Sequence, residues 1–160
     1  MYMDLYLGVG TGGTLMGIGQ KLKKVNRDLL VTAIEPDKMP MISKNKIISN
    51  HKIEGIGDDF VPDLVDKGKI DRIYLVNDDD AINMSRFLSR KLGLGVGISS
   101  GANFLGCVML QENLQKPVVT VFADDNKKYL STELSQNIND NKEFISNQIE
   151  LIDYKVIGNK

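Results

Sequence analysis

A glycine- and threonine-rich run near the amino terminus has the residue types and spacing of a phosphate-binding loop. An apolar stretch at residues 5–7 leads into the run Gly8-Val9-Gly10-Thr11-Gly12-Gly13-Thr14, and a helical pattern follows it. Glycines let the backbone approach a ligand closely, and the free N–H groups at a helix N-terminus favour an anion. Thr11 and Thr14 add hydroxyl donors. The run therefore predicts a phosphate site, with a tight strand-to-helix turn that binds nothing as the alternative.

The glycine spacing alone fits more than one class of protein. Gly8, Gly10 and Gly13 match the G-x-G-x-x-G pattern of dinucleotide-binding domains, and Glu35 stands near the position where those domains place an acid. The run lacks the Gly-Lys-Ser/Thr ending of the nucleoside-triphosphate loop. A nucleotide-binding domain therefore stays open as an alternative, and tight nicotinamide binding would distinguish it.

Further motifs follow the glycine run in a fixed order. Residues 51–53 read His-Lys-Ile, residues 55–57 read Gly-Ile-Gly, residues 97–103 read Gly-Ile-Ser-Ser-Gly-Ala-Asn, and residues 128–132 read Lys-Tyr-Leu-Ser-Thr. Together they resemble the cysteine synthase and cystathionine β-synthase family of fold-type-II pyridoxal-phosphate enzymes. The resemblance extends from Asp4 to Thr132 and implies the carboxyl-terminal portion of such an enzyme.

The resemblance assigns roles to individual positions. The residues that match the family's phosphate-binding loop are Gly10, Thr11, Gly12, Gly13 and Thr14. Ser99 matches the serine that hydrogen-bonds the pyridine nitrogen of the cofactor, and Gly55 matches the glycine beside the cofactor in the loop that closes over the substrate. From the residues alone, Ser99 also fits a cap of the following helix, and Gly55 fits an ordinary turn.

Two segments depart from the family pattern. Asp58 and Asp59 stand where the family has a pair of small residues after Gly-Ile-Gly. We expect Asp58 to act as a general base on water, which would favour release of sulfide from cysteine and formation of serine; solvated loop acids are the alternative. Residues 124–128 replace the family's Ser-Gly-Glu-Arg, so the tuning of the substrate site is expected to differ there.

The Schiff-base lysine of the family lies in an amino-terminal segment near a Ser-x-Lys motif, and a Thr-Ser-Gly-Asn substrate loop follows it. The Thr-Ser-Gly-Asn motif does not occur in these 160 residues, and the Ser-x-Lys triplet at residues 89–91 lies far from the amino-terminal position of the family's lysine. Lys21, Lys23 and Lys24 fall on a predicted helix and are expected to be solvated surface charges. The resemblance therefore implies a fragment that lacks the catalytic lysine and is inactive by itself.

The resemblance implies a β-replacement reaction that uses pyridoxal phosphate. O-Acetylserine and sulfide would give cysteine through an aminoacrylate, and the full-length enzyme would be a homodimer. One alternative is a cysteine lyase (desulfhydrase) or a cystathionine β-synthase-like enzyme that releases hydrogen sulfide. An alternative of another class is a non-catalytic fragment that retains a phosphate-binding cup.

Composition excludes several partners. The chain is 42% hydrophobic with a net charge of −1, so it lacks the basic excess of a nucleic-acid-binding protein. No apolar run has membrane-spanning length, no secretion signal is visible, and no metal site is predicted. The single cysteine, Cys107, is expected to be buried and fits a reducing cytoplasm.

The elements that must position these motifs alternate between strands and helices. Strands are predicted at residues 5–9, 29–34, 71–76 and 118–122, and helices at residues 14–25 and after Asp78 or Asp79, one of which is expected to be the N-cap. Alternation predicts an α/β fold with a doubly wound parallel sheet, incomplete at its amino-terminal side, and with sites at the carboxyl ends of its strands. Residues 1–132 would form the pyridoxal-phosphate domain. Residues 133–160 would form a polar tail that either holds one helix near residues 144–151 or is mobile.

Overall fold

The computed structural model describes residues 3–111, 117–136 and 141–158. Within these residues, four parallel strands form one sheet in the order β3-β2-β1-β4. The strands are β1 (Asp4–Gly8), β2 (Val31–Pro36), β3 (Arg72–Val76) and β4 (Val118–Val119). The α-helices are α1 (Gly13–Lys23), α2 (Met41–Lys44), α3 (Asp78–Leu92) and α4 (Ile98–Gln111), and the 3-10 turns are η1 (Lys67–Lys69), η2 (Lys127–Tyr129), η3 (Glu133–Ser135) and η4 (Ile145–Asn147). The predicted α/β fold with a parallel sheet is confirmed.

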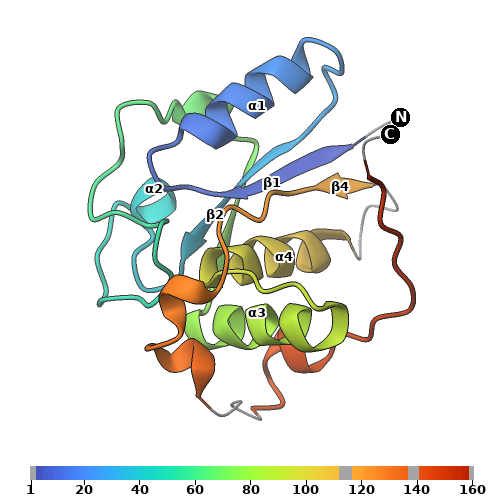
Figure 1. Cartoon of the computed structure of the whole chain (residues 1–160). Helices are drawn as coiled ribbons and strands as arrows, with labels where there is room; N and C mark the ends of the chain where they lie inside the picture. Colours follow the sequence, from blue (N-terminus) through green and yellow to red (C-terminus); the bar gives the residue numbers. More distant parts are fainter. Residues whose placement is uncertain (1–2, 112–116, 137–140, 159–160) are drawn as a thin grey trace.

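The sheet separates two apolar cores. Side chains alternate between its faces, so that Leu5 and Leu7 of β1 pack toward α1 while Tyr6 packs toward α3 and α4. Figure 1 shows α1 on one side of the sheet, and α4 and α3 on the other. Because helices cover both faces, β1 and β2 are buried on both sides, which explains their nearly continuous apolar sequences.

The neighbours β1 and β4 mark the point where the strand order reverses. The chain runs from β1 through α1 to β2 on one side, and it later adds β4 on the other side of β1, so that Leu5 lies in register between Val31 and Val119. In open α/β sheets, ligands bind beyond the carboxyl ends of the strands at this reversal. The glycine run begins where β1 ends, at this position.

The last strand is shorter than the sequence predicts. A strand is expected over residues 118–122, but β4 ends at Val119. Beyond it, the hydroxyl of Thr120 donates to the carbonyl of Tyr6 at 2.7 Å, and the side-chain amide of Asn103 donates to the carbonyl of Val121 at 2.9 Å. In this segment, hydrogen bonds from side chains therefore replace the backbone hydrogen bonds that a longer β4 would form with β1.

The N-cap of α3 also differs from the prediction. Neither Asp78 nor Asp79 is the cap; instead Asn77 precedes the helix in an extended conformation, and its side-chain oxygen accepts from the N–H groups of Asp79 and Asp80. The cap position requires a non-helical backbone. Asp78 and Asp79 already have helical geometry, so the asparagine before them takes this role.

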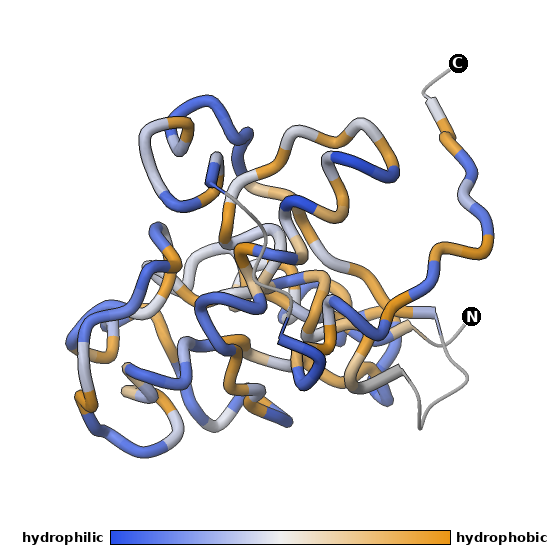
Figure 2. Tube along the Cα trace, turned by 90° about the horizontal axis from the view of Figure 1, so that it is seen from below, coloured by the Kyte–Doolittle hydropathy of each residue, from blue (hydrophilic) through white to orange (hydrophobic). Residues whose placement is uncertain are grey.

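The carboxyl-terminal segment contains short turns where one helix is expected. Near residues 144–151 the structure has η4 alone, because the carboxylate of Asp80 accepts from the N–H groups of Ile145 and Ser146 at 2.9 Å each and fixes this turn on α3. Arg86 donates to the carbonyl of Leu134 at 3.0 Å. After η4 the chain runs away from the packed body (Figure 2), with Ile152 96% exposed. The division between a domain at residues 1–132 and a tail at residues 133–160 stays a prediction.

Two further observations concern the described ranges. No helix there is long and apolar enough to cross a membrane, and no group of three or more His, Cys, Asp or Glu side chains there is placed to hold a metal ion.

Cys107 is 5% exposed, and burial raises the pKa of its thiol to about 12. Its predicted burial is confirmed, and a thiol with such a pKa is a poor nucleophile at neutral pH.

Candidate cofactor-binding site

The turn between β1 and α1 requires glycine at two positions. Gly12, the N-cap of α1, has a φ of 85°, and a Cβ atom there would lie 2.5 Å from a side-chain carbon of Val65. A Cβ atom at Gly10 would lie 2.5 Å from the carbonyl oxygen of Gly55. Gly12 has a left-handed backbone, and at Gly10 the backbone of Gly55 comes close. Both positions therefore require a residue without a Cβ atom.

The N-terminus of α1 has no acceptor of its own. Gly12 carries no side chain that could cap the helix, and the first turn contains no acidic residue. Thr11 Oγ1 lies 3.5 Å from the nitrogen of Gly13, a distance that is long for a hydrogen bond. The first N–H groups of a helix lack partners within it. This end of α1 is therefore a partly positive site that suits an anion.

A cavity of about 360 Å³ opens at this helix end. It brings together most of the residues that the sequence predicts for the site: Gly10, Thr11, Gly12, Thr14, Gly55 and Ser99 all line it. Gly13 is the first residue of α1 and does not line the cavity, and neither does Asp58, whose side chain is exposed. The general-base role of Asp58 therefore stays a prediction.

Ser99 reaches the cavity from the first turn of α4. The helix begins at Ile98, so Ser99 lies inside it and is not its N-cap; the N–H groups of Ser100 and Gly101 are instead oriented toward the carbonyl of Gly97, at 3.1 and 3.3 Å. The side chain of Ser99 is buried, and within the described part of the chain its hydroxyl has no hydrogen-bond partner. An unpartnered hydroxyl on a cavity wall is suited to a ligand atom.

Glu35 does not fit the role of a ribose-binding acid. It is 1% exposed, and its two carboxylate oxygens accept from the backbone N–H groups of Ile42 and Ser43 at 2.8 and 3.0 Å. The Ser43 hydroxyl donates to the same carboxylate. Both oxygens are thus used to hold α2, so the dinucleotide alternative loses the residue on which it depended.

Asn103 also lines the cavity, although no sequence motif assigns it to the site. Its side-chain oxygen accepts from the N–H of Gly8 at 2.6 Å, and its amide donates to Val121 as described above. Asn103 therefore joins the carboxyl ends of β1 and β4 to α4 at the floor of the cavity. The sequence feature that could have indicated this role is the position of Asn103, a polar residue directly before the apolar run of α4.

Asp124 and Lys128 also line the cavity and form an ion pair. The carboxylate of Asp124 accepts from Lys128 Nζ at 2.8 Å and from the hydroxyl of Tyr129 at 2.6 Å. The hydrogen bond to Asp124 raises the pKa of Lys128, so the ammonium stays charged. Lys128 is therefore a cation facing the cavity and not a neutral amine available as a nucleophile.

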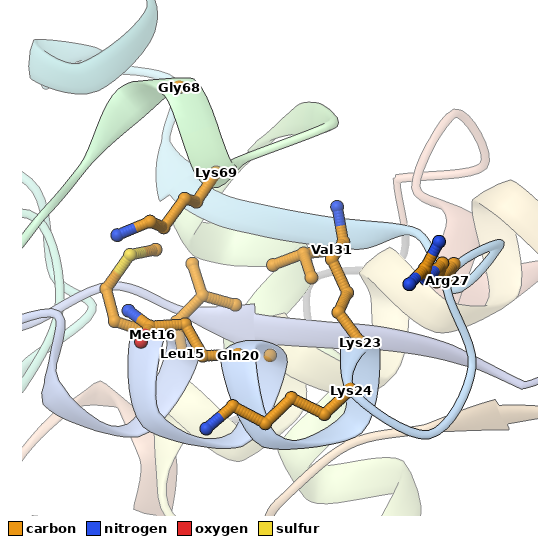
Figure 3. Close-up of a pocket in the computed structure, with 10 residues that line it drawn as sticks. Leu15, Met16, Gln20, Lys23, Lys24, Arg27, Val31, Gly68 and Lys69 are labelled. Atoms are coloured by element: carbon orange, nitrogen blue, oxygen red, sulfur yellow. The ribbon is translucent and has the colours of Figure 1, made fainter.

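A larger cavity, of about 560 Å³, lies on the other flank of α1. Figure 3 shows its apolar floor of Leu15, Met16 and Val31 with lysines and an arginine around it. Two of these cations are already paired, Lys23 with Asp71 at 2.6 Å and Lys69 with Asp66 at 2.9 Å. Cavity volume alone therefore does not identify the site; the smaller cavity has the fixed N–H groups and hydroxyls.

The sequence pattern of the family described as "Pyridoxal-phosphate dependent enzyme" matches residues 3–124. The chain belongs to this family. Among the curated pyridoxal-phosphate dependent relatives, cysteine synthase B of Campylobacter jejuni is 40% identical over 134 residues, which cover 82% of this chain and 44% of that protein. The chain thus spans less than half the length of such relatives.

Solved structures of the family agree in fold. A hydrogen sulfide-producing enzyme from Fusobacterium nucleatum is 47% identical, with a TM-score of 0.84 over 91% of this chain and 44% of that one. O-Acetyl serine sulfhydrylase isoform 3 from Entamoeba histolytica is 32% identical, with a TM-score of 0.83 over 92% of this chain and 44% of that one.

Pyridoxal phosphate is the cofactor of this family, and the residues present fit it. The uncapped end of α1 offers N–H donors to a phosphate, and the glycines leave room for its oxygens. The hydroxyl of Ser99, on the cavity wall, offers a hydrogen bond to a ring nitrogen. The cavity volume of about 360 Å³ falls within the range of small-molecule sites.

Proposed function

We propose that the protein containing this chain catalyses pyridoxal-phosphate-dependent β-replacement, as a cysteine synthase. O-Acetylserine and sulfide would give cysteine and acetate, with a C–O bond broken and a C–S bond formed at the β-carbon. The observation that carries this proposal is a single cavity lined by the glycine loop, Gly55 and Ser99. The 40% identity to a cysteine synthase supports it.

In this proposal the chain's own residues bind and orient the cofactor. The backbone N–H groups at the start of α1, with the hydroxyls of Thr11 and Thr14, hold the phosphate. The hydroxyl of Ser99 would donate one hydrogen bond to the pyridine nitrogen, which would stay largely unprotonated. Bound pyridoxal phosphate supplies an electron sink that weakens bonds at the substrate's α- and β-carbons.

The proposal requires a Schiff-base lysine from outside these 160 residues. Lys128 is held as an ammonium ion by Asp124. Lys21 and Lys23 lie on α1 and Lys24 is its C-cap, and none of the three lines the cavity. We therefore expect the purified chain to show no turnover without a second polypeptide. We also expect the complete enzyme to be a cytoplasmic homodimer, as the family resemblance and the single cysteine suggest.

The first experiment is to determine the intact mass of the native protein and then to assay it. We expect a mass above that of this chain and formation of cysteine from O-acetylserine and sulfide when pyridoxal phosphate is present. A native protein of this mass alone that forms no cysteine would favour the non-catalytic fragment. Turnover by this chain alone would contradict the requirement for an external lysine.

A second candidate function is release of hydrogen sulfide from cysteine, with water as the other substrate and serine as the product. The 47% identity to a hydrogen sulfide-producing enzyme favours it. Asp58 follows the Gly55–Gly57 loop, and closure of that loop would bring its carboxylate toward the cavity to act as a general base. Asp58→Ala in the complete enzyme is expected to reduce sulfide release while Asp59→Ala is not, and unchanged release in the first variant would remove this role.

A further inference from the structure

The chain's single histidine closes the loop that carries Gly55 and Gly57. In His51 the Nε2 atom lies 2.7 Å from the carbonyl oxygen of Gly57, and the Nδ1 atom accepts from the N–H of Ile53 at 3.2 Å. The imidazole thus links both ends of the segment 53–57. We refer to these two hydrogen bonds as the His51 bridge.

The two hydrogen bonds define the protonation state of the imidazole. A carbonyl oxygen can only accept, so Nε2 must carry a hydrogen, and a backbone N–H can only donate, so Nδ1 must be unprotonated. The observed loop therefore requires the neutral Nε2–H tautomer of His51. A protonated imidazole would direct its Nδ1 hydrogen at the N–H of Ile53, and this hydrogen bond would be lost.

The His51 bridge is connected to the phosphate-binding loop through the backbone. The N–H of Gly57 donates to the carbonyl of Val9 at 2.9 Å, and Val9 stands within the glycine run. Gly57 has a φ of 76°, and a Cβ atom there would lie 2.5 Å from Pro36 and 3.0 Å from Nε2 of His51. Two residues earlier, the carbonyl of Gly55 packs against Gly10. The position of this cavity wall thus depends on where His51 holds the loop.

We propose that His51 is a positioning residue: its neutral imidazole holds the Gly55–Gly57 loop against the glycine run, and protonation or removal of the imidazole releases that loop from the cavity wall. The effect on cofactor binding rests on the proposed function, whereas the His51 bridge itself does not. The role is one of positioning, because His51 does not line the cavity.

Charged groups around His51 determine how acid affects the bridge. Lys52, Glu54 and Glu133 line a cavity of about 220 Å³ together with His51. The ammonium of Lys52 binds Glu133 at 2.6 Å and Asp79 at 3.2 Å. Protonation of the imidazole would open the His51 bridge without breaking these ion pairs, because the His51 hydrogen bonds are to backbone groups of Gly57 and Ile53.

The first test is the ¹⁵N NMR spectrum of the imidazole in the purified 160-residue protein, where one histidine gives one set of signals. At pH 7.5 we expect a protonated Nε2 and an unprotonated Nδ1. A neutral Nδ1–H tautomer, a rapidly exchanging mixture or a charged ring at this pH would overturn the proposal. This measurement requires no substitution and no cofactor.

The second test compares amide hydrogen exchange in matched variants. His51→Gln retains a side-chain N–H near the Nε2 position and does not titrate, whereas His51→Ala loses both hydrogen bonds. Loss of one net hydrogen bond corresponds to about a tenfold change in an opening equilibrium. At pH 7.5 we expect the protection factor of the Gly57 N–H to be about tenfold lower in His51→Ala than in the original protein. In His51→Gln it should stay close to that of the original protein.

A sulfate titration at pH 7.5 separates this proposal from the proposed function. We expect sulfate to shift the amide signals at the start of α1 and to bind more weakly to His51→Ala than to the original protein, with most of the affinity retained in His51→Gln. If sulfate fails to bind while the tautomer and exchange results hold, the anion site fails and the His51 bridge stands. Equal protection of Gly57 in the original protein and in His51→Ala would overturn the bridge.

Discussion

The N-termini of α1 and α3 are built in opposite ways, although each helix follows a strand of the same parallel sheet. At α3 the side chain of Asn77 accepts from two backbone N–H groups, and three aspartates occupy the first turn. At α1 the cap is Gly12, without a side chain, and the first turn contains no acid. One helix end satisfies its own donors, and the other leaves them to face a cavity.

The difference indicates which helix end serves a ligand. An acid in the first turn of a helix contributes about 0.3–1 kcal/mol, so α1 forgoes a stabilising interaction that α3 has. A bound phosphate would supply the same interaction from outside the chain. The N-terminus of α3 cannot bind a phosphate in this way, because it is buried and Asp78 there is 0% exposed. Three predictions test this contrast, beginning with the change expected to have the largest effect.

Replacement of the α1 cap should damage both stability and anion binding. Gly12→Ala places a Cβ atom 2.5 Å from Val65 at a φ of 85°. Left-handed strain and overpacking together should lower the free energy of unfolding by about 3 kcal/mol, as measured by urea denaturation. Sulfate binding, followed by NMR, should also be lost because the turn shifts.

Gly17 offers a matched control in the same helix. A Cβ atom there meets no other atom within 4 Å, so Gly17→Ala should raise the free energy of unfolding by about 0.5–1 kcal/mol and leave sulfate binding unchanged. Similar losses in Gly12→Ala and Gly17→Ala would show that the turn at α1 has no special requirement for glycine.

Local motifs explain why the sequence could predict most of the cavity. Gly10, Thr11, Gly12 and Thr14 lie where a strand meets a helix, and Ser99 lies at another helix start, so topology alone carries them to the carboxyl edge of the sheet. Their roles toward the cofactor stay predictions. The fold itself followed from the alternation of apolar strands with helices.

Long-range contacts explain what the sequence could not predict. Asn103 belongs to the site because it bonds to Gly8, a residue 95 positions away. The helix expected near residues 144–151 is replaced by a turn that Asp80 caps from α3, 65 positions away along the chain. The cap of α3 was misassigned for a local reason, since an asparagine and three aspartates in succession are all suitable caps.

Adding an acid to α1 should make its N-terminus resemble that of α3. Thr14 is exposed in the first turn, so Thr14→Asp should raise the free energy of unfolding by about 0.5 kcal/mol. Because the new carboxylate repels an anion bound a few ångströms away, sulfate affinity should fall about tenfold or more. Thr14→Asn, nearly the same shape without the charge, should bind sulfate much more tightly than the aspartate variant. Equal affinity in the two variants would place the anion elsewhere.

Removal of the α3 cap should produce the smallest change and affect stability alone. Asn77→Ala leaves the N–H groups of Asp79 and Asp80 without their acceptor, which typically costs about 1 kcal/mol. Asn77→Ser retains a capping oxygen and should recover most of this loss in urea denaturation. Neither variant should alter sulfate binding, because the donors of α3 are satisfied within the protein and do not face the cavity. If Asn77→Ala weakened sulfate binding as much as Thr14→Asp, the two helix ends would not differ in function.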